Sequence, residues 1–180
     1  MCIIDIIENT GKYTQAEIAC IRYSYLSIRN DLGKILIIIG ICTLMGTGKE
    51  SILILMSMIP VRMLMGGIHA KSFLRCLLIS FGWVTIGICL ARVMEAWSEW
   101  LTCITLASSL VLIHADPIES ANKRCLTNQE RKRRKRLSIL IALIVLLIMV
   151  IINNPIYKNC ICMGLLIDNT QIFILDRGKK

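Results

Sequence analysis

Long apolar runs, separated by short polar or basic stretches, dominate the pattern of this 180-residue chain. Six runs of about 15 to 22 residues approach the roughly 20 apolar residues with which a helix crosses a bilayer. They cover residues 32–46, 51–65, 73–94, 97–113, 137–152 and 155–175. The pattern therefore predicts an all-α fold, a polytopic membrane bundle of about six transmembrane or partly re-entrant helices.

Residues 3–30 differ from these runs, because apolar and charged positions are mixed in them at helical spacing. Ile18, Ile21, Tyr25 and Ile28 recur along one side, with glutamate and arginine between them. This spacing is typical of an amphipathic helix. We expect it to lie at the membrane interface or to pack on the cytoplasmic ends of the bundle.

The expected domain organisation is one integral-membrane domain, residues 1–180, with an amphipathic helix in 1–30 and the transmembrane bundle in 31–180. The first apolar run is short for a full crossing. Lys34 lies near its start, and we expect its ammonium group to reach the interface and so lengthen the span.

The composition agrees with a membrane protein, since 56% of the residues are hydrophobic and 18% are charged. Soluble domains contain about 25% charged residues. The net charge of +9 does not indicate a nucleic-acid partner, because the basic residues flank apolar runs, as in proteins that contact membrane lipid. The nine cysteines are odd in number and include no CxxC pair, so we expect reduced thiols without a disulfide framework or zinc site.

The distribution of lysine and arginine predicts the orientation. If both termini are cytoplasmic, all but three of the 21 basic residues fall in cytoplasmic segments; the exceptions are Lys49, Arg92 and Lys158. The positive-inside rule therefore favours a multi-pass protein with both termini and the link at 61–76 in the cytoplasm. The basic run RKRRKR, 131–136, is read as a stop signal on anionic lipid, and a role in holding an acidic peptide is compatible with this.

The link VRMLMGGIHAKSFLRC, residues 61–76, carries the candidate chemistry. A cysteine becomes a nucleophile when a histidine accepts its proton, or when cations and a helix N-terminus favour the thiolate. His69 is the candidate base, and Lys71 and Arg75 are the cations near it in sequence. Ser72 can cap the helix that follows.

Geometry limits how His69 can serve Cys76. On one continuous helix the two residues would share a face but lie about 10 Å apart, at about 1.5 Å per residue. That separation is too long for a hydrogen bond. Gly66 and Gly67 can break the helix, because glycine reaches backbone conformations that other residues avoid. We therefore predict a broken helix near these glycines and a close approach of His69 to Cys76.

Other interpretations of these residues stay open at this point. A lone histidine and cysteine in a membrane turn are more often structural than catalytic. His114 is the other histidine of the sequence, so a His/His/Cys metal site is an alternative, although no acidic ligand spacing or HExxH motif supports it. A non-enzymatic small transporter or sensor scaffold would carry ionisable residues in the middle of its spans. The middles of the second, fourth and fifth runs have none, and apart from charges at the ends of runs only Asp168 in the sixth run qualifies.

A set of spaced residues in this link resembles the signature of the accessory gene regulator B family, bacterial membrane cysteine endopeptidases that process the propeptide of a cyclic autoinducing peptide. The set consists of Arg62, Gly66, Gly67, His69 and Cys76. The segment IRNDLGK, the apolar pattern and the basic link after HADPIE are also similar, so the likeness covers most of the chain. This link is less proline-rich than the family's, which leaves the roles of Asp116 and Pro117 open.

The resemblance implies that Cys76 attacks the peptide bond at the C-terminal side of the future ring, while His69 activates the thiol and protonates the leaving amine. A cysteine or serine of the propeptide would then open the acyl-enzyme thioester and form a thiolactone or lactone. The implied partner is a quorum-sensing propeptide with an amphipathic leader and an acidic C-terminal tail, and a homodimer is the implied assembly. No cofactor or metal is implied. The residues expected to bind substrate or support the site are Arg62, Gly66, Gly67, Lys71 and Arg75.

Overall fold

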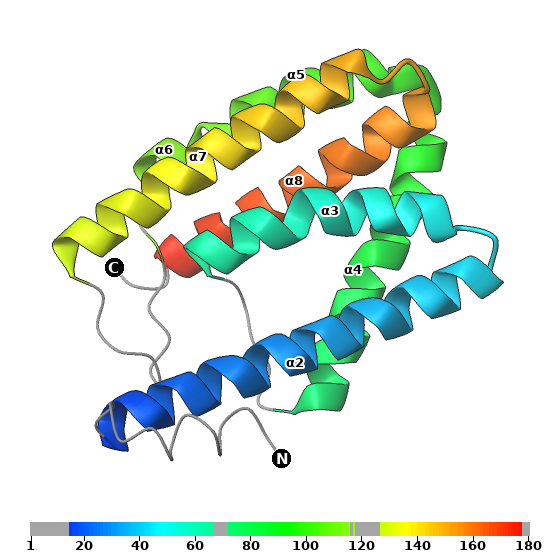
Figure 1. Ribbon diagram of the computed structural model, residues 1–180. Coiled ribbons are helices and arrows are strands. Elements are labelled where there is room, and N and C mark those ends of the chain that lie inside the picture. The colour runs from blue at the N-terminus through cyan, green and yellow to red at the C-terminus, as the bar shows by residue number, and fades with distance from the viewer. Residues whose placement is uncertain (1–14, 67–71, 116, 118–126, 178–180) are drawn as a thin grey trace.

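A computed structural model describes residues 15–66, 72–115, 117 and 127–177 (Figure 1). Every regular element in these residues is a helix, which confirms the predicted all-α class. The elements are α2 (Gln15–Leu44), α3 (Gly48–Met65), α4 (Phe73–Val93), the 3-10 helix η1 (Glu95–Trp97), α5 (Ser98–Ser109), α6 (Val111–His114), α7 (Asn128–Ile151) and α8 (Pro155–Arg177).

The α3, α4 and α8 helices agree closely with predicted apolar runs, and three other elements differ. The α2 helix joins the end of the amphipathic segment to the first apolar run without a break. The fourth run is divided among η1, α5 and α6. The α7 helix begins nine residues before the apolar run at 137–152, so the basic run forms its first turns.

The early start of α7 has a local cause in a capping box. The Thr127 hydroxyl accepts a hydrogen bond from the backbone N–H of Glu130 at 3.3 Å, and the Glu130 carboxylate accepts from the Thr127 N–H at 2.9 Å. This reciprocal pair satisfies donors that the first turn of a helix leaves open. Lysine and arginine, which follow in 131–136, are good helix formers.

Glycine and asparagine shape two tight links at one end of the bundle, the link between α2 and α3 and the link between α7 and α8. Gly46 has a φ of 76°, and the N–H of Thr47 donates to the carbonyl of Cys42 at 2.8 Å, which closes α2 in the manner typical of a glycine C-terminus. At the start of α8, the Asn154 side chain accepts from the Tyr157 N–H at 3.1 Å, and Pro155 occupies the first helical position.

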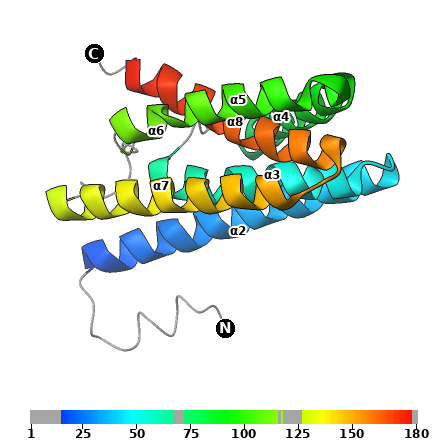
Figure 2. The ribbon, with the colours of Figure 1, turned by 90° about the horizontal axis from the view of Figure 1, so that it is seen from above.

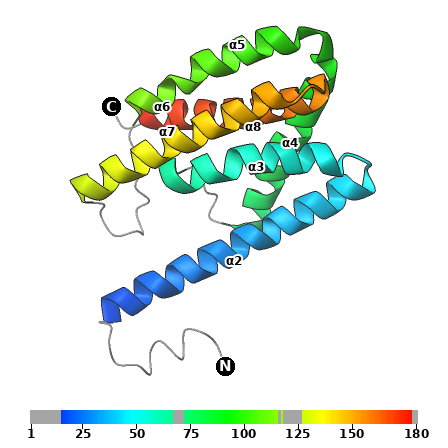
Figure 3. The same cartoon turned by 45° about the horizontal axis from the view of Figure 1, so that its top comes forward.

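The α8 helix is the centre of the bundle, in contact with α3, α4, α5, α6 and α7. Figures 1 and 3 show α3 between α2 and α8, while α4 crosses the direction of these helices steeply. The α2 helix lies at the edge, where it packs on α3 and α4. Figures 1 and 2 place the N-terminal ends of α2 and α7 and the C-terminal end of α8 at one end of the bundle.

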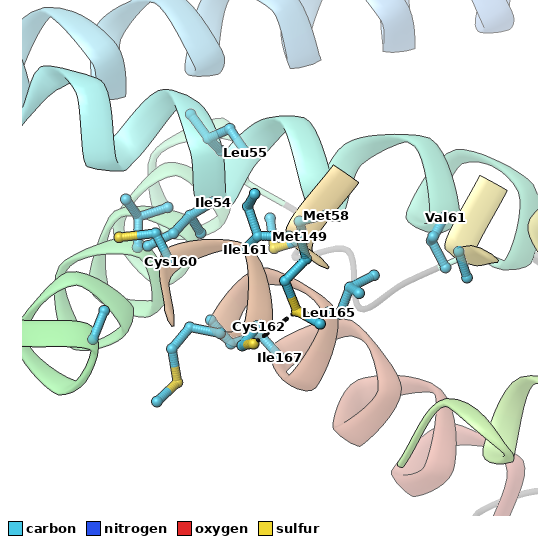
Figure 4. Close-up of a cluster of buried hydrophobic side chains, with 14 of the residues drawn as sticks. Ile54, Leu55, Met58, Val61, Met149, Cys160, Ile161, Cys162, Leu165 and Ile167 are labelled. Atoms are coloured by element: carbon cyan, nitrogen blue, oxygen red, sulfur yellow. Dashed lines mark hydrogen bonds between the residues drawn. The ribbon is translucent and has the colours of Figure 1, made fainter. Parts of the chain in front are cut away.

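Apolar side chains of α3, α7 and α8 interlock in the core (Figure 4). Met149 and Leu165 are fully buried, and the Cys162 thiol donates to the Met149 sulfur at 3.1 Å. Gly164 allows α8 to approach α3 closely, because a Cβ atom there would come within 2.7 Å of the carbonyl oxygen of Ile54. Small residues of this kind let neighbouring backbones meet.

Among the residues that the structure describes, α4 is the one helix long and apolar enough to cross a membrane by length and composition. Large apolar side chains are also exposed on the other long helices; examples are Leu36, Met56, Leu147 and Val150. A water-soluble protein rarely exposes so many. The prediction of about six crossings stays a prediction.

Candidate functional site

Cys76 lies one turn into α4, where the site begins. Ser72 occupies the N-cap position with an extended backbone (φ −109°, ψ 139°), as predicted, although its side chain makes no capping hydrogen bond. The Cys76 N–H donates to the Ser72 carbonyl at 3.0 Å, which is the first hydrogen bond of the helix. The Cys76 side chain is buried, with the residue 6% exposed. A nucleophile in this position benefits from the positive end of the helix dipole.

The helix break predicted at the glycines is present at Gly66. The α3 helix ends at Met65, and Gly66 has φ 87° and ψ 174°, with its N–H donating to the Arg62 carbonyl at 2.9 Å. A side chain is strained at this positive φ, so glycine is the residue that ends the helix here without penalty. At Gly66 the backbone thus leaves the helical path that α3 follows.

Three of the predicted site residues, Gly67, His69 and Lys71, lie outside the described residues. The predicted contact between His69 and Cys76 therefore stays a prediction. The described ends on either side, Gly66 and Ser72, are separated by five residues, and this short link contains His69.

Among the described residues, a cation from a helix that the sequence did not point to contacts Cys76. Lys34 of α2 donates a hydrogen bond from Nζ to the Cys76 Sγ at 3.3 Å, across 42 residues of sequence. Arg75, the predicted neighbouring cation, has an exposed side chain on α4. Lys34 is only 9% exposed, and its ammonium group is directed into the α2–α4 contact. The prediction that it reaches the membrane interface stays a prediction.

Two groups hold the Lys34 ammonium beside the cysteine. Asp31, one turn earlier on α2, accepts from Nζ at 2.6 Å and forms an ion pair with it. The aromatic ring of Phe73 lies with its centroid 5.9 Å from Nζ, within the range of a cation–π contact. Asp31 is 45% exposed, so the pair has a buried cationic end at the sulfur and a more open anionic end.

Sequence reasoning assigned no role at the site to Lys34, although a signal was present. An ionisable residue inside an apolar run is expensive in a membrane and is usually functional. Lys34 sits two residues inside the first run. The missing information was its partner, which depends on how α2 packs against α4.

Arg62 and Asp168 form a second polar feature, at the C-terminal end of α3. Arg62 lies one turn before Gly66 and is half-buried. Asp168 of α8 is 2% exposed, so burial disfavours a charge on its carboxyl group, and the attraction of the Arg62 charge offsets only part of this cost. An acidic residue buried in the bundle thus lies within electrostatic reach of the arginine predicted to support the site.

Two ion pairs involve basic residues that the orientation count assigned to the outer side. Arg92 donates to Glu50 at 2.7 Å, and Lys158 donates to Glu99 at 2.8 Å. Burial alone would raise the pKa of Glu50, but the hydrogen bond from Arg92, a backbone hydrogen bond and the nearby positive charges together outweigh burial and hold that pKa below its usual value. Each pair offsets the positive charge of one basic residue that the orientation count placed on the outer side.

Comparison with known proteins supports the resemblance seen in the sequence. The model of the accessory gene regulator B family matches residues 1–175. None of the curated proteins and none of the solved structures compared with the chain shows a significant match. The chain therefore belongs to the accessory gene regulator B family, whose members are membrane-associated and take part in autoinducing-peptide processing in quorum sensing.

Proposed function

We propose that this protein is a membrane-embedded cysteine endopeptidase that cleaves the C-terminal part of a quorum-sensing propeptide and promotes its cyclisation. The observation that carries the proposal is the position of Cys76. It lies in the first turns of α4, beside a charged lysine, after a helix break whose short link contains His69. Cation, helix N-terminus and nearby histidine are the features that activate cysteine nucleophiles.

The proposed reaction has two acyl transfers. His69 takes the proton of the Cys76 thiol, and Sγ attacks the carbonyl carbon at the C-terminal side of the future ring. The C–N bond breaks, and the proton passes from His69 to the leaving amine. The product is a thioester on Cys76. A cysteine or serine side chain of the propeptide loses its proton, attacks this thioester and forms a thiolactone or lactone, with return of the Cys76 thiol.

Burial of the nucleophile fits cyclisation better than hydrolysis. A thioester on Cys76 would form where the side chain is already screened from solvent, since the residue is 6% exposed. Exclusion of water protects a reactive intermediate until an internal nucleophile reaches it. The exchange of one thioester for another changes little in energy, so the acyl-enzyme can pass its activated carbonyl to the ring at little cost.

The proposed setting is the bacterial cytoplasmic membrane, crossed several times, with both termini and the site on the cytoplasmic side. The basic turns of α7 share one end of the bundle with the C-terminal end of α8 (Figures 1 and 2). These turns, residues 131–136, would rest on anionic lipid and attract the acidic tail of the propeptide. Its amphipathic leader would lie along the membrane, and two copies of the chain would form a homodimer.

Co-expression with the propeptide tests the assignment of Cys76. Cys76→Ala should abolish cleavage, while Cys89→Ala, which removes another free cysteine of the same helix, should leave cleavage intact. His69→Ala should also abolish it. Persistent cleavage in the Cys76 variant would show that this residue is not the nucleophile, and would favour a scaffold or transporter role for the chain.

A further inference from the structure

We propose that Lys34 is a third catalytic residue, whose ammonium group stabilises the Cys76 sulfur each time that sulfur carries negative charge. The inference rests on the proposed function, because it assigns a role in the same acyl transfers. It concerns a residue on α2, outside the link in which the sequence concentrates the candidate chemistry.

The direction of the hydrogen bond identifies the charge state that the contact favours. An ammonium group has three N–H donors and no acceptor, so in the contact of 3.3 Å the sulfur must be the acceptor. A thiolate is a far better acceptor than a thiol. Hydrogen bonds between ionised partners are also about twice as strong as neutral ones. The contact therefore stabilises the nucleophilic form of Cys76.

The neighbours of Lys34 fix the position of its ammonium group. Asp31 binds the ammonium from one side and Phe73 approaches it with its ring, while a second N–H is directed at the sulfur. The residue is 9% exposed, and water can screen little of its attraction for the sulfur. A lysine that served only solubility or membrane anchoring would be directed toward the solvent instead.

The proposed division of labour leaves the lysine proton in place. His69 accepts the thiol proton, and Lys34 remains an ammonium ion throughout. It stabilises the thiolate before Sγ attacks the peptide carbonyl. Once the thioester has formed, the sulfur is neutral and the attraction is lost. When the propeptide nucleophile expels Cys76, the sulfur again leaves as an anion, and Lys34 stabilises that leaving group before the proton returns.

Alkylation of Cys76 by iodoacetamide tests this role without any propeptide. The full-length protein in membranes is treated over a range of pH, and the Cys76 peptide is quantified by mass spectrometry. Lys34→Met should slow alkylation near neutral pH by about tenfold, the effect of losing one close cation, and displace the pH profile toward higher pH. Lys34→Arg should stay near the wild-type profile, because it retains the charge.

Matched controls separate the charge from the fold. Lys49→Met removes an exposed lysine and should leave the profile unchanged. Alkylation of Cys89, an exposed cysteine of the same helix, measures reagent access in every sample. Should Lys34→Met fail to accumulate, Lys34→Gln, which removes the charge but keeps a polar side chain, should displace the profile in the same direction.

An unchanged alkylation rate and pH profile in Lys34→Met, or in Lys34→Gln if it replaces that variant, would overturn the role of Lys34. That result would leave the proposed peptidase function standing, since it bears on the lysine alone. Failure of the peptidase function shows itself differently, as propeptide cleavage that survives Cys76→Ala.

Discussion

The ammonium nitrogen of Lys34 lies 3.3 Å from the sulfur of Cys76, although 42 residues separate them in sequence. The contact joins the middle of α2 to the first turns of α4. Packing of these two helices is therefore part of the candidate site. A change that shifts α2 against α4 should alter the reactivity of Cys76 even when it leaves the link at 66–72 untouched.

The first prediction follows from the backbone conformation of Gly66. Its φ of 87° and ψ of 174° lie in a region that is almost restricted to glycine and that other residues enter at a cost of about 1–3 kcal/mol. Gly66→Ala should therefore favour continuation of α3 and draw the catalytic link away from Cys76. We expect reduced cleavage in co-expression. Gly40→Ala, at an open position within α2, is the control and should retain activity. Equal activity of the two variants would show that the break at Gly66 is dispensable.

The close approach at Gly164 makes a prediction about stability. A methyl group there would meet the Ile54 carbonyl at 2.7 Å, and the helix backbone cannot yield as a side chain can. Overpacking of this kind costs about 1–3 kcal/mol. Gly164→Ala should lower the melting temperature in detergent. Gly82→Ala, which meets nothing within 4 Å, should not lower it. A Gly164 variant as stable as the wild type would mean that α3 and α8 are less tightly packed.

Asn159 links α8 to the C-terminal end of α4. Its side-chain N–H groups donate to the carbonyls of Ala91 and Met94 at 3.0 and 2.9 Å, and the residue is fully buried. Asn159→Leu would leave both carbonyls without this donor, at about 1–3 kcal/mol for each buried group. We expect a larger loss of thermal stability than for Asn154→Ala, which removes an exposed cap. The reverse order would contradict this account of the α4 terminus.

The ion pair of Glu50 and Arg92 predicts a pH dependence. The folded-state pKa of Glu50 is lowered, so the pair stabilises the protein above the unfolded-state pKa. This contribution is lost as the pH falls through the folded-state pKa. Glu50→Gln should therefore reduce the melting temperature at neutral pH and converge on the wild type in acid. A difference that persists at low pH would point to packing rather than charge.

The helices were largely predictable because each apolar run is long and bounded by polar residues. The start of α7 was missed, although the pattern Thr127–Glu130 is a capping-box signature that the sequence carries. The continuity of α2 was missed because a change from amphipathic to apolar pattern does not itself end a helix. The α2 helix continues through Gly33, because the residues that follow Gly33 do not favour a turn.

The candidate site was predictable only in its local part. Cys76, Arg62 and Gly66 lie close in sequence, and their spacing carried both the helix break and the family resemblance. The contribution of Lys34 depends on tertiary packing, because nothing in the spacing of residues 34 and 76 indicates that α2 crosses the start of α4. Long-range pairing of this kind becomes visible only once the helices are placed.

The most direct test of the central claim is to trap the acyl-enzyme. The full-length protein is incubated with its propeptide, quenched in acid and analysed by mass spectrometry. A propeptide fragment linked to Cys76 and released by hydroxylamine is the predicted result, because hydroxylamine cleaves thioesters. The adduct should be missing in Cys76→Ala and present in Cys89→Ala. Cleaved propeptide with an adduct on another residue, or a hydroxylamine-resistant link at Cys76, would contradict the account.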